Sequence, residues 1–218
     1  MLVLYLLFFA SGCAALIYET VWFHLVQLVV GASSISVAVL LCSFMGGMAL
    51  GSAWLPRLLP ATVHPLRLVA ALEVGIGVLG VLIPVALPGV RQAYVAAVGY
   101  GYGGVLLRAG VCVLILTPPT MLMRATLPVI ARWLETSRLG ASRTGLIYTA
   151  NIAGGAVGTV LAGFYLLRVH DTVIAGAVAV VINVVVAIAA WALASRRSAL
   201  APACARADSG ELRRELVE

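Results

Sequence analysis

Lysine is absent from the sequence, and all 14 basic residues are arginine. Charged residues make up only 10% of the chain, whereas a soluble domain carries about 25%. This shortage of charge excludes a soluble globular domain and a disordered chain. The arginines are not interleaved with aromatic residues, so no nucleic-acid partner is expected despite the net charge of +6.

Cysteine is also scarce. The four cysteines form no C-x-x-C pair, and the first three lie in apolar runs; they are Cys13, Cys42, Cys112 and Cys204. Such spacing is typical of small buried residues rather than of a disulfide scaffold, a metal centre or a redox site. The sequence therefore predicts no metal and no cofactor.

Hydrophobic residues, by contrast, make up 63% of the 218 residues and gather in six long runs. A transmembrane helix needs about 20 such residues, and each run reaches that length. The sequence predicts an all-α polytopic membrane protein, with a six-helix domain over residues 1–197 and a short cytoplasmic tail over 198–218. The predicted spans are approximately 2–30, 34–55, 68–87, 94–116, 144–167 and 172–194.

The distribution of charge supports these spans. Only three of the 22 charged residues fall inside them, as expected if hydrocarbon excludes charge. Eleven arginines fall on the side of the predicted topology that carries both termini, and two, Arg91 and Arg168, fall on the other. By the positive-inside rule both termini are predicted to be cytoplasmic, with the protein in the lipid bilayer of the plasma (inner) membrane.

The longest predicted loop runs from Thr117 to Arg143. It opens with Pro118-Pro119, which predicts the end of the fourth span because proline removes a helical hydrogen bond. Leu127, Ile130 and Leu134 then recur on one face, which predicts an amphipathic helix on the cytoplasmic membrane surface. A solvated loop is the alternative.

Glycines recur at helical spacing within the spans, as at Gly47 and Gly51 in the second span and Gly154 and Gly158 in the fifth. Small residues four positions apart allow helix backbones to approach closely in lipid. We expect these glycines to mark helix–helix contacts.

The polar residues inside the spans are the candidate site. Glu73 and Arg108 fall at similar predicted depths on neighbouring antiparallel spans, so we expect an ion pair between them. Asn151 lies at a similar depth, and Asn183 lies in the middle of the sixth span. Each of these groups is interpreted either as part of a binding site or as a static contact that fixes helix packing.

Glu19 has no cation at its predicted depth. An unpaired carboxylate in a membrane suits proton coupling or cation binding, and a hydrogen bond to Tyr18 or to another helix is the alternative. His24 and His170 both fall near the predicted outer face. Two histidines at one depth also match a bis-histidine haem site, which is a weaker hypothesis.

Four segments, in this order along the chain, resemble the membrane part of fused MFS/spermidine-synthase-like proteins. They are Ser11–Trp22 (SGCAALIYETVW), Phe44–Ser52 (FMGGMALGS), Pro119–Pro128 (PTMLMRATLP) and Tyr148–Gly158 (YTANIAGGAVG). The resemblance implies a six-helix bundle similar to half of a major-facilitator transporter. Longer relatives carry an aminopropyltransferase domain, for which the tail after residue 197 has no room, so no enzyme activity is expected.

Three hypotheses for function follow. The first is a transport-related bundle for a small solute, with a cation or an amine as the preferred class and with Glu19, Glu73, Arg108 and Asn151 as the substrate-binding residues. A facilitator needs two such halves around its site, so this hypothesis requires a homodimer. The second is a structural or accessory subunit of a larger membrane complex. The third is a cofactor-binding membrane subunit, which rests on the two histidines alone.

Overall fold

The computed structural model describes residues 1–31, 33–60, 62–97, 102–134 and 140–215, without the side chains of residues 30, 96, 97, 102, 140 and 197–215. Of the described residues, 94% are helical and none forms a strand. The prediction of an all-α protein is therefore confirmed.

Within the described residues, six helices are long and apolar enough to cross a membrane, so the predicted number of such helices is confirmed. A short helix, α3 (Leu55–Leu58), follows α2 after Trp54, whereas a π-helical turn η1 (Leu161–Leu166) and α7 (Leu167–Val169) prolong α6. The crossing helices are α1 (Leu2–Val30), α2 (Ser34–Ala53), α4 (Pro65–Ala97), α5 (Tyr102–Leu134), α6 (Gly140–Val160) and α8 (Thr172–Glu215).

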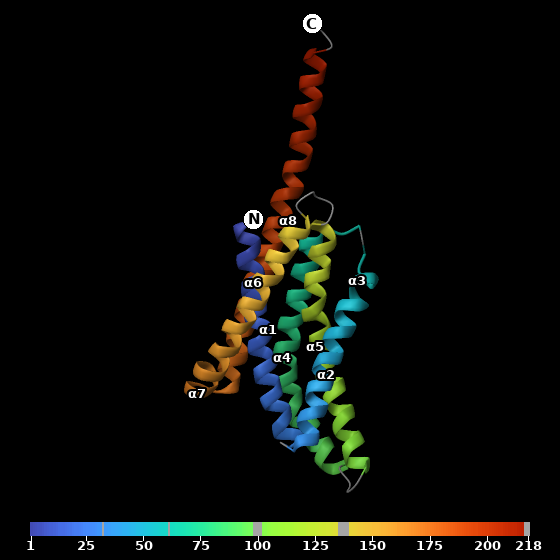
Figure 1. Ribbon diagram of the computed structural model, residues 1–218, viewed down its shortest axis with the longest axis vertical. Helices are drawn as coiled ribbons and strands as arrows, with labels where there is room; N and C mark the ends of the chain where they lie inside the picture. The colour runs from blue at the N-terminus through green and yellow to red at the C-terminus, as the bar shows by residue number, and fades with distance from the viewer. Residues whose placement is uncertain (32, 61, 98–101, 135–139, 216–218) are drawn as a thin grey trace.

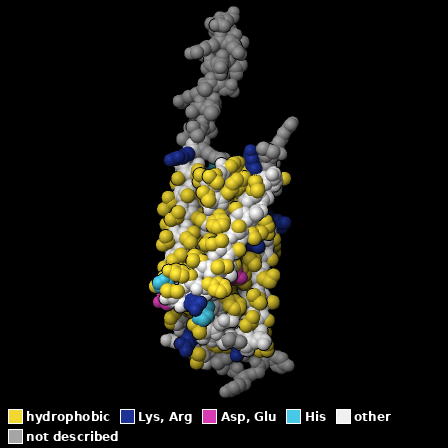
Figure 2. All heavy atoms as spheres, turned by 60° about the vertical axis from the view of Figure 1, so that its left-hand side comes forward, with side chains coloured by type: hydrophobic (Ala, Val, Ile, Leu, Met, Phe, Trp, Pro, Cys, Tyr) yellow, Lys and Arg dark blue, Asp and Glu magenta, His cyan; other side chains and the backbone are white. Residues whose placement is uncertain are grey.

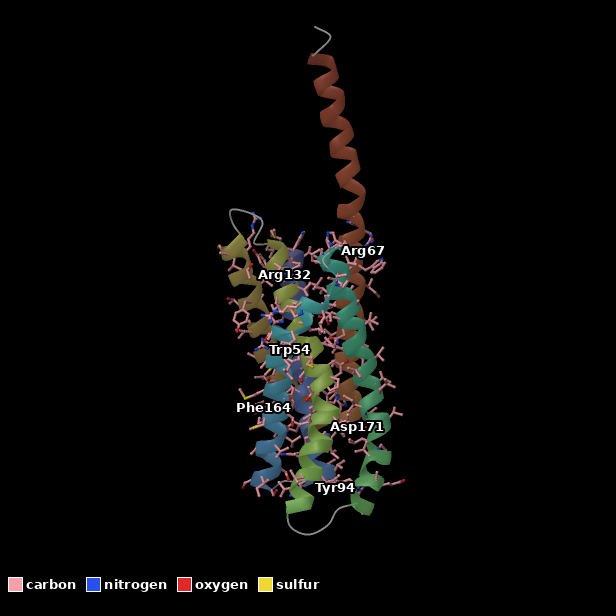
Figure 3. The ribbon with its side chains drawn as sticks, turned by 90° about the vertical axis from the view of Figure 1, so that its right-hand side faces the viewer. Trp54, Arg67, Tyr94, Arg132, Phe164 and Asp171 are labelled. Carbon is pink, nitrogen blue, oxygen red and sulfur yellow. The ribbon has the colours of Figure 1, made fainter. Side chains whose placement is uncertain are left out.

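The six helices run roughly along the long axis of an elongated bundle (Figure 1). The N-terminus and the C-terminal part of α8 lie at the same end of this bundle, which we call the terminal end. Arg67 and Arg132 lie toward the terminal end and Tyr94 lies at the opposite end (Figure 3). The cytoplasmic location of the terminal end stays a prediction from the arginine count.

The helices pack in an order that relates the first three crossings to the last three. The most extensive contacts are between α1 and α6 and between α2 and α5, followed by α4 with α8. The next are α1 with α8 and α4 with α5. These contacts are unchanged as a set when α1 is exchanged with α5, α2 with α6 and α4 with α8. The α1–α6 contact then becomes the α2–α5 contact, the α1–α8 contact becomes the α4–α5 contact, and the α4–α8 contact becomes itself. This is the packing order of two three-helix repeats.

Glycines form the two most extensive contacts. A Cβ atom on Gly154 or Gly158 would overlap the backbone of α1 at Phe9 or Cys13. A Cβ atom on Gly51 would likewise overlap the α5 backbone at Met121. The expectation of close helix contacts is confirmed at these three glycines and at Gly47, where a Cβ atom would meet Thr117 and Thr120. It is wrong at Gly46 and Gly163 of the same spans, which have nothing within 4 Å of an added Cβ.

The prediction that Pro118-Pro119 ends the fourth span is wrong. Helix α5 continues through both prolines to Leu134. The Thr120 hydroxyl donates to the carbonyls of Leu116 at 2.8 Å and Thr117 at 3.0 Å, so a side chain joins the helical hydrogen bonding next to the prolines. Packed neighbours and threonine hydroxyls allow proline inside membrane helices in this way.

The predicted surface helix after residue 126 is the last part of α5 instead. Ile130 is fully buried and Leu134 is 5% exposed, both in a core cluster with residues of α1, α4 and α8. At the other end of this span, Tyr94 belongs to the end of α4 rather than to the beginning of the fourth crossing. As a result α5 begins and ends later in the sequence than the predicted span 94–116. Each polar residue on α5 therefore lies at a different depth in the bundle from the depth predicted for it.

Candidate functional site

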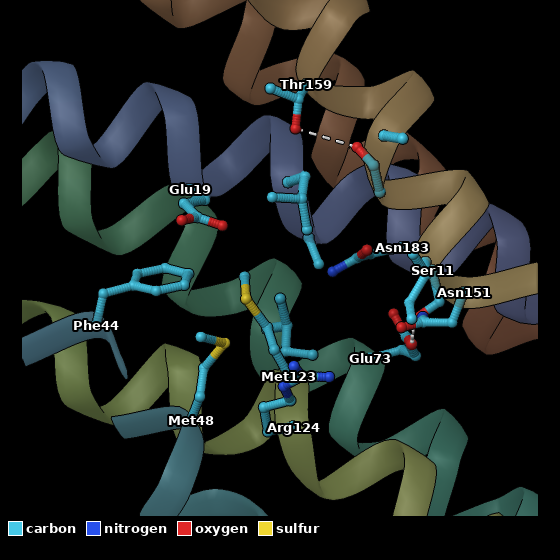
Figure 4. Close-up of a pocket in the computed structure, with 16 residues that line it drawn as sticks. Ser11, Glu19, Phe44, Met48, Glu73, Met123, Arg124, Asn151, Thr159 and Asn183 are labelled. Atoms are coloured by element: carbon cyan, nitrogen blue, oxygen red, sulfur yellow. Dashed lines mark hydrogen bonds between the residues drawn. The ribbon is translucent and has the colours of Figure 1, made fainter. Parts of the chain in front are cut away.

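A cavity of about 360 Å³ lies inside the bundle and is lined by all six crossing helices. Its wall is mainly apolar, with side chains such as Leu16, Phe44 and Met48 (Figure 4). Seven polar or charged side chains interrupt this wall: Ser11, Glu19, Glu73, Arg124, Asn151, Thr159 and Asn183. An apolar cavity with a few convergent polar groups is the usual form of a small-molecule site.

Glu73 is the most deeply buried charged group in this cavity, with 1% of its surface exposed. The Ser11 hydroxyl of α1 donates to its Oε1 atom at 2.5 Å. Its Oε2 atom has no hydrogen-bond partner among the described residues, although it is buried. A carboxylate oxygen that is removed from water without a partner is costly, so this atom is a natural point of attachment for a ligand or for water.

Asn183 of α8 faces the same cavity and is 1% exposed. Its Nδ2 atom is also buried without a partner in the described part of the chain. Gly77 of α4 lies next to it, where an added Cβ would be 3.9 Å from the Cβ of Asn183. Among the residues that the structure describes, an acceptor on Glu73 and a donor on Asn183 therefore both lack partners in one cavity.

Asn151 of α6 has a structural contact as well as a place in the cavity wall. Its Nδ2 atom donates to the Phe8 carbonyl of α1 at 3.1 Å. The backbone of α1 comes close enough because Gly12 lies against Asn151, and a Cβ on Gly12 would overlap the Asn151 carbonyl. This hydrogen bond joins α1 to α6 at the depth of the cavity.

Glu19 lies on α1 two turns beyond Ser11 and is half-buried in the cavity wall. The positive charge of Arg124 on α5 acts on its carboxylate. The expectation that no cation lies at the depth of Glu19 is therefore wrong. The physical reason is that α5 continues through Pro118 and Pro119, so Arg124 lies within a crossing helix rather than in a loop.

The predicted ion pair between Glu73 and Arg108 is also wrong. Arg108 lies near the beginning of α5 and donates to the Tyr94 hydroxyl at 3.0 Å and to the hydroxyls of Ser33 and Ser36 at 3.3 Å each. Tyr94 is 21 residues beyond Glu73 on α4, which is about 30 Å along a helix. Arg108 therefore ties α2, α4 and α5 together at the end opposite the terminal end, far from the cavity.

The structure thus brings Glu19, Glu73 and Asn151 into one cavity and leaves Arg108 outside it. Arg124 and Ser11 also line the cavity, although no sequence pattern predicts them as site residues. The apolar residues on both sides of Arg124, such as Met123 and Leu127, are the signal that could have placed it within a span.

The two histidines of the haem hypothesis lie apart from this cavity wall. His24 is exposed on α1, and His170 lies just after α7 with its ring 5.7 Å from that of Tyr165. Within the described ranges, no group of three or more His, Cys, Asp or Glu side chains has the arrangement of a metal site.

Comparison of the chain with protein-family models, with curated proteins and with solved structures gives no match. The function is therefore inferred from the cavity and from the packing of the helices.

Proposed function

We propose that this integral membrane protein is a transport-related bundle that binds a small cationic solute, with an amine as the preferred class, in its central cavity. The observation that carries the proposal is the buried Glu73 carboxylate, whose Oε2 atom has no hydrogen-bond partner within the described chain. An ammonium group supplies both the positive charge and the N–H donor that this oxygen lacks. Charge-assisted hydrogen bonds of this kind are short and strong.

The remaining polar groups of the cavity fit a solute that carries a second polar group besides its amine. The unpaired Nδ2 atom of Asn183 offers a donor, so a solute that also carries an oxygen acceptor satisfies both groups. The apolar wall accommodates an alkyl body, and about 360 Å³ suits a small molecule. With Glu19, Glu73 and Arg124, the cavity has one more negative than positive group.

The packing order supports a relationship to half of a facilitator. The six-helix halves of major-facilitator transporters each contain two three-helix repeats of inverted topology. The contact pattern of α1, α2 and α4 with α5, α6 and α8 has the corresponding order. Together with the four segments that resemble fused MFS/spermidine-synthase-like proteins, this favours a transport role over that of a membrane enzyme.

The test is binding by the purified protein in lipid nanodiscs. The probes are ethanolamine, butylamine and putrescine, each compared with its uncharged alcohol analogue. We expect at least one amine to bind and its alcohol analogue to bind much more weakly. We expect Glu73→Gln to weaken amine binding about 10- to 100-fold, since a hydrogen bond to a charged group contributes about 1.5–3 kcal/mol.

Asp171→Asn is the matched control for this variant. It removes one negative charge at the beginning of α8, where Asp171 accepts from the Ile174 backbone at 2.8 Å and lies outside the cavity. We expect this control to bind the amine as the unchanged protein does. Equal binding by amines and alcohols, or an equal loss in both variants, contradicts the proposal.

The second hypothesis, an accessory subunit of a larger membrane complex, is favoured by a different observation: α2 and α6 both line the cavity, yet they are not among the helix pairs in extensive contact over the described residues. Purification under mild conditions separates the two hypotheses. Several different subunits in fixed ratio, without amine binding, would support the accessory role.

A further inference from the structure

Arg124 is a charged residue inside a membrane crossing that lacks a close partner. It lies on α5 ten residues before Leu134, which is about 15 Å along the helix from the end of this crossing. Its side chain is half-buried and makes no hydrogen bond and no direct ion pair with another described residue. Hydrophobic side chains cover most of the face shown in Figure 2, and the hydrocarbon that adjoins such a face supplies no anion. A guanidinium group carries N–H donors and no acceptor, so Arg124 needs an anion from elsewhere.

A second hollow, of about 370 Å³, adjoins the central cavity at this arginine. Met48 and Arg124 belong to the walls of both spaces. The other residues that line the second hollow are Ala49, Ser52, Leu127, Pro128 and Tyr148, so its lining contains no acid. An anionic group placed where the two spaces join therefore meets a positive charge without a carboxylate beside it.

Arg124 and Glu73 lie at one level of the bundle. Helices α4 and α5 run in opposite directions (Figure 3), and a Cβ on Gly75 would be 3.2 Å from the Cδ1 atom of Leu122. Glu73 lies two residues before Gly75 on α4. Arg124 lies two residues after Leu122 on α5, so both charged residues are displaced from this contact by about 3 Å toward the terminal end.

The two charges remain separate in the protein itself. Glu73 and Arg124 enter the same cavity from α4 and α5 (Figure 4). The Glu73 carboxylate accepts from Ser11 of α1, and its Oε2 atom has no partner in the described chain. Arg124 borders the second hollow instead. A negative and a positive group at one level therefore both have free hydrogen-bonding capacity toward the space between them.

We propose that the solute is a zwitterion, whose ammonium group binds Glu73 and whose anionic group, a carboxylate or a phosphate, binds Arg124 where the cavity joins the second hollow. This inference rests on the proposed function, because it adds an anionic group to the amine that Glu73 binds. The ammonium group supplies the donor that the Oε2 atom of Glu73 lacks. The oxygens of the anionic group accept from the guanidinium, whose planar fork matches carboxylate and phosphate geometry.

The proposal gives Arg124 opposite effects on two kinds of amine. For an amine without an anionic group, the guanidinium is a like charge in the same cavity and weakens binding. For a zwitterion, the guanidinium is the partner of the anionic end and strengthens binding. The sign of the Arg124 effect therefore identifies the class of solute.

Titration of the purified protein in lipid nanodiscs tests the proposal with pairs of probes that share an amine and differ in negative charge. The pairs are 4-aminobutanoate with its methyl ester, 6-aminohexanoate with its methyl ester, and O-phosphoethanolamine with ethanolamine. In at least one pair we expect the zwitterion to bind about 10- to 100-fold more tightly than the other member, the range for a hydrogen bond to a charged group. In Arg124→Gln we expect this preference to disappear or to reverse.

Two further variants separate loss of the charge from loss of the fold. Arg124→Lys keeps the positive charge and should keep most of the preference for the zwitterion. Arg91→Gln is the matched control, because it removes one arginine from an exposed position on α4 that lines neither the cavity nor the second hollow. We expect the preference in Arg91→Gln to equal that of the unchanged protein.

The outcomes distinguish this inference from the proposed function. If amines bind but each zwitterion binds no better than the other member of its pair, this inference is overturned and the proposed function stands. A preference that survives in Arg124→Gln, or butanoate that binds as tightly as 4-aminobutanoate, would also overturn it. Failure of every amine to bind, zwitterions included, would overturn the proposed function and this inference with it.

Discussion

The contact between α1 and α6 allows a sharp test of the fold around the cavity. In Gly154→Ala the added Cβ would lie 2.7 Å from the Phe9 carbonyl carbon, and the two helices have to separate. Overpacking of this kind costs about 1–3 kcal/mol. Separation also strains the Asn151–Phe8 hydrogen bond, and interhelical hydrogen bonds in membranes contribute about 0.6–1.7 kcal/mol.

We therefore expect Gly154→Ala to destabilise the protein by about 2–4 kcal/mol, which is more than Asn151→Ala alone. The measurement is reversible unfolding in bicelles, followed by helical circular dichroism. Gly145→Ala is the matched control, because Gly145 lies on the same helix and has nothing within 4 Å of an added Cβ. If Gly154→Ala unfolds no more easily than Gly145→Ala, the close contact between α1 and α6 is refuted.

Three further outcomes are expected. Arg108→Leu removes the hydrogen bonds to Tyr94, Ser33 and Ser36 and should lower the free energy of unfolding by about 1–3 kcal/mol in the same assay. Amine binding should stay unchanged. A loss of binding at unchanged stability would contradict the placement of Arg108 outside the cavity. Arg124→Gln removes the positive charge of the cavity and should strengthen amine binding about five- to thirtyfold. This is the effect of a unit charge about 8–16 Å away at an effective dielectric constant of about 20. Titration of the amine in nanodiscs measures the change, and weaker binding would show that Arg124 contacts the solute. Reporter fusions after Arg143 and after Arg91 should report cytoplasm and exterior respectively, and export of the Arg143 fusion would reverse the predicted orientation.

The number and type of the helices were predictable because hydrophobic runs and glycine spacing are local properties of the sequence. The positions of Glu19, Glu73 and Asn151 within the membrane followed from the same runs. The partner of each charge did not follow, because it depends on where a helix begins and ends. The two prolines at 118 and 119 indicate a helix end in water, whereas the packed bundle and the Thr120 hydroxyl keep α5 helical.

This single difference explains the errors at the site. Because α5 continues to Leu134, Arg108 lies closer to the end opposite the terminal end than predicted, and Arg124 lies in the cavity wall rather than in a loop. The hydrogen bond between Ser11 and Glu73 lay beyond sequence reasoning, because the two residues are 62 positions apart and no local pattern links them. Such pairs are set by tertiary packing alone.

The order in which the helices pack has a consequence for biosynthesis. The hydrogen bond between Phe8 and Asn151 joins residues 143 positions apart, and a ribosome adds about 5–20 residues per second. Helix α1 therefore enters the bilayer about 7–30 s before α6 exists to cover its glycine face. During this interval the face of α1 around Gly12 is open to lipid or to the insertion machinery, so the nascent chain depends on protection until its fifth crossing is made. Slower translation between α2 and α6 should increase its degradation, even though the finished protein is unchanged.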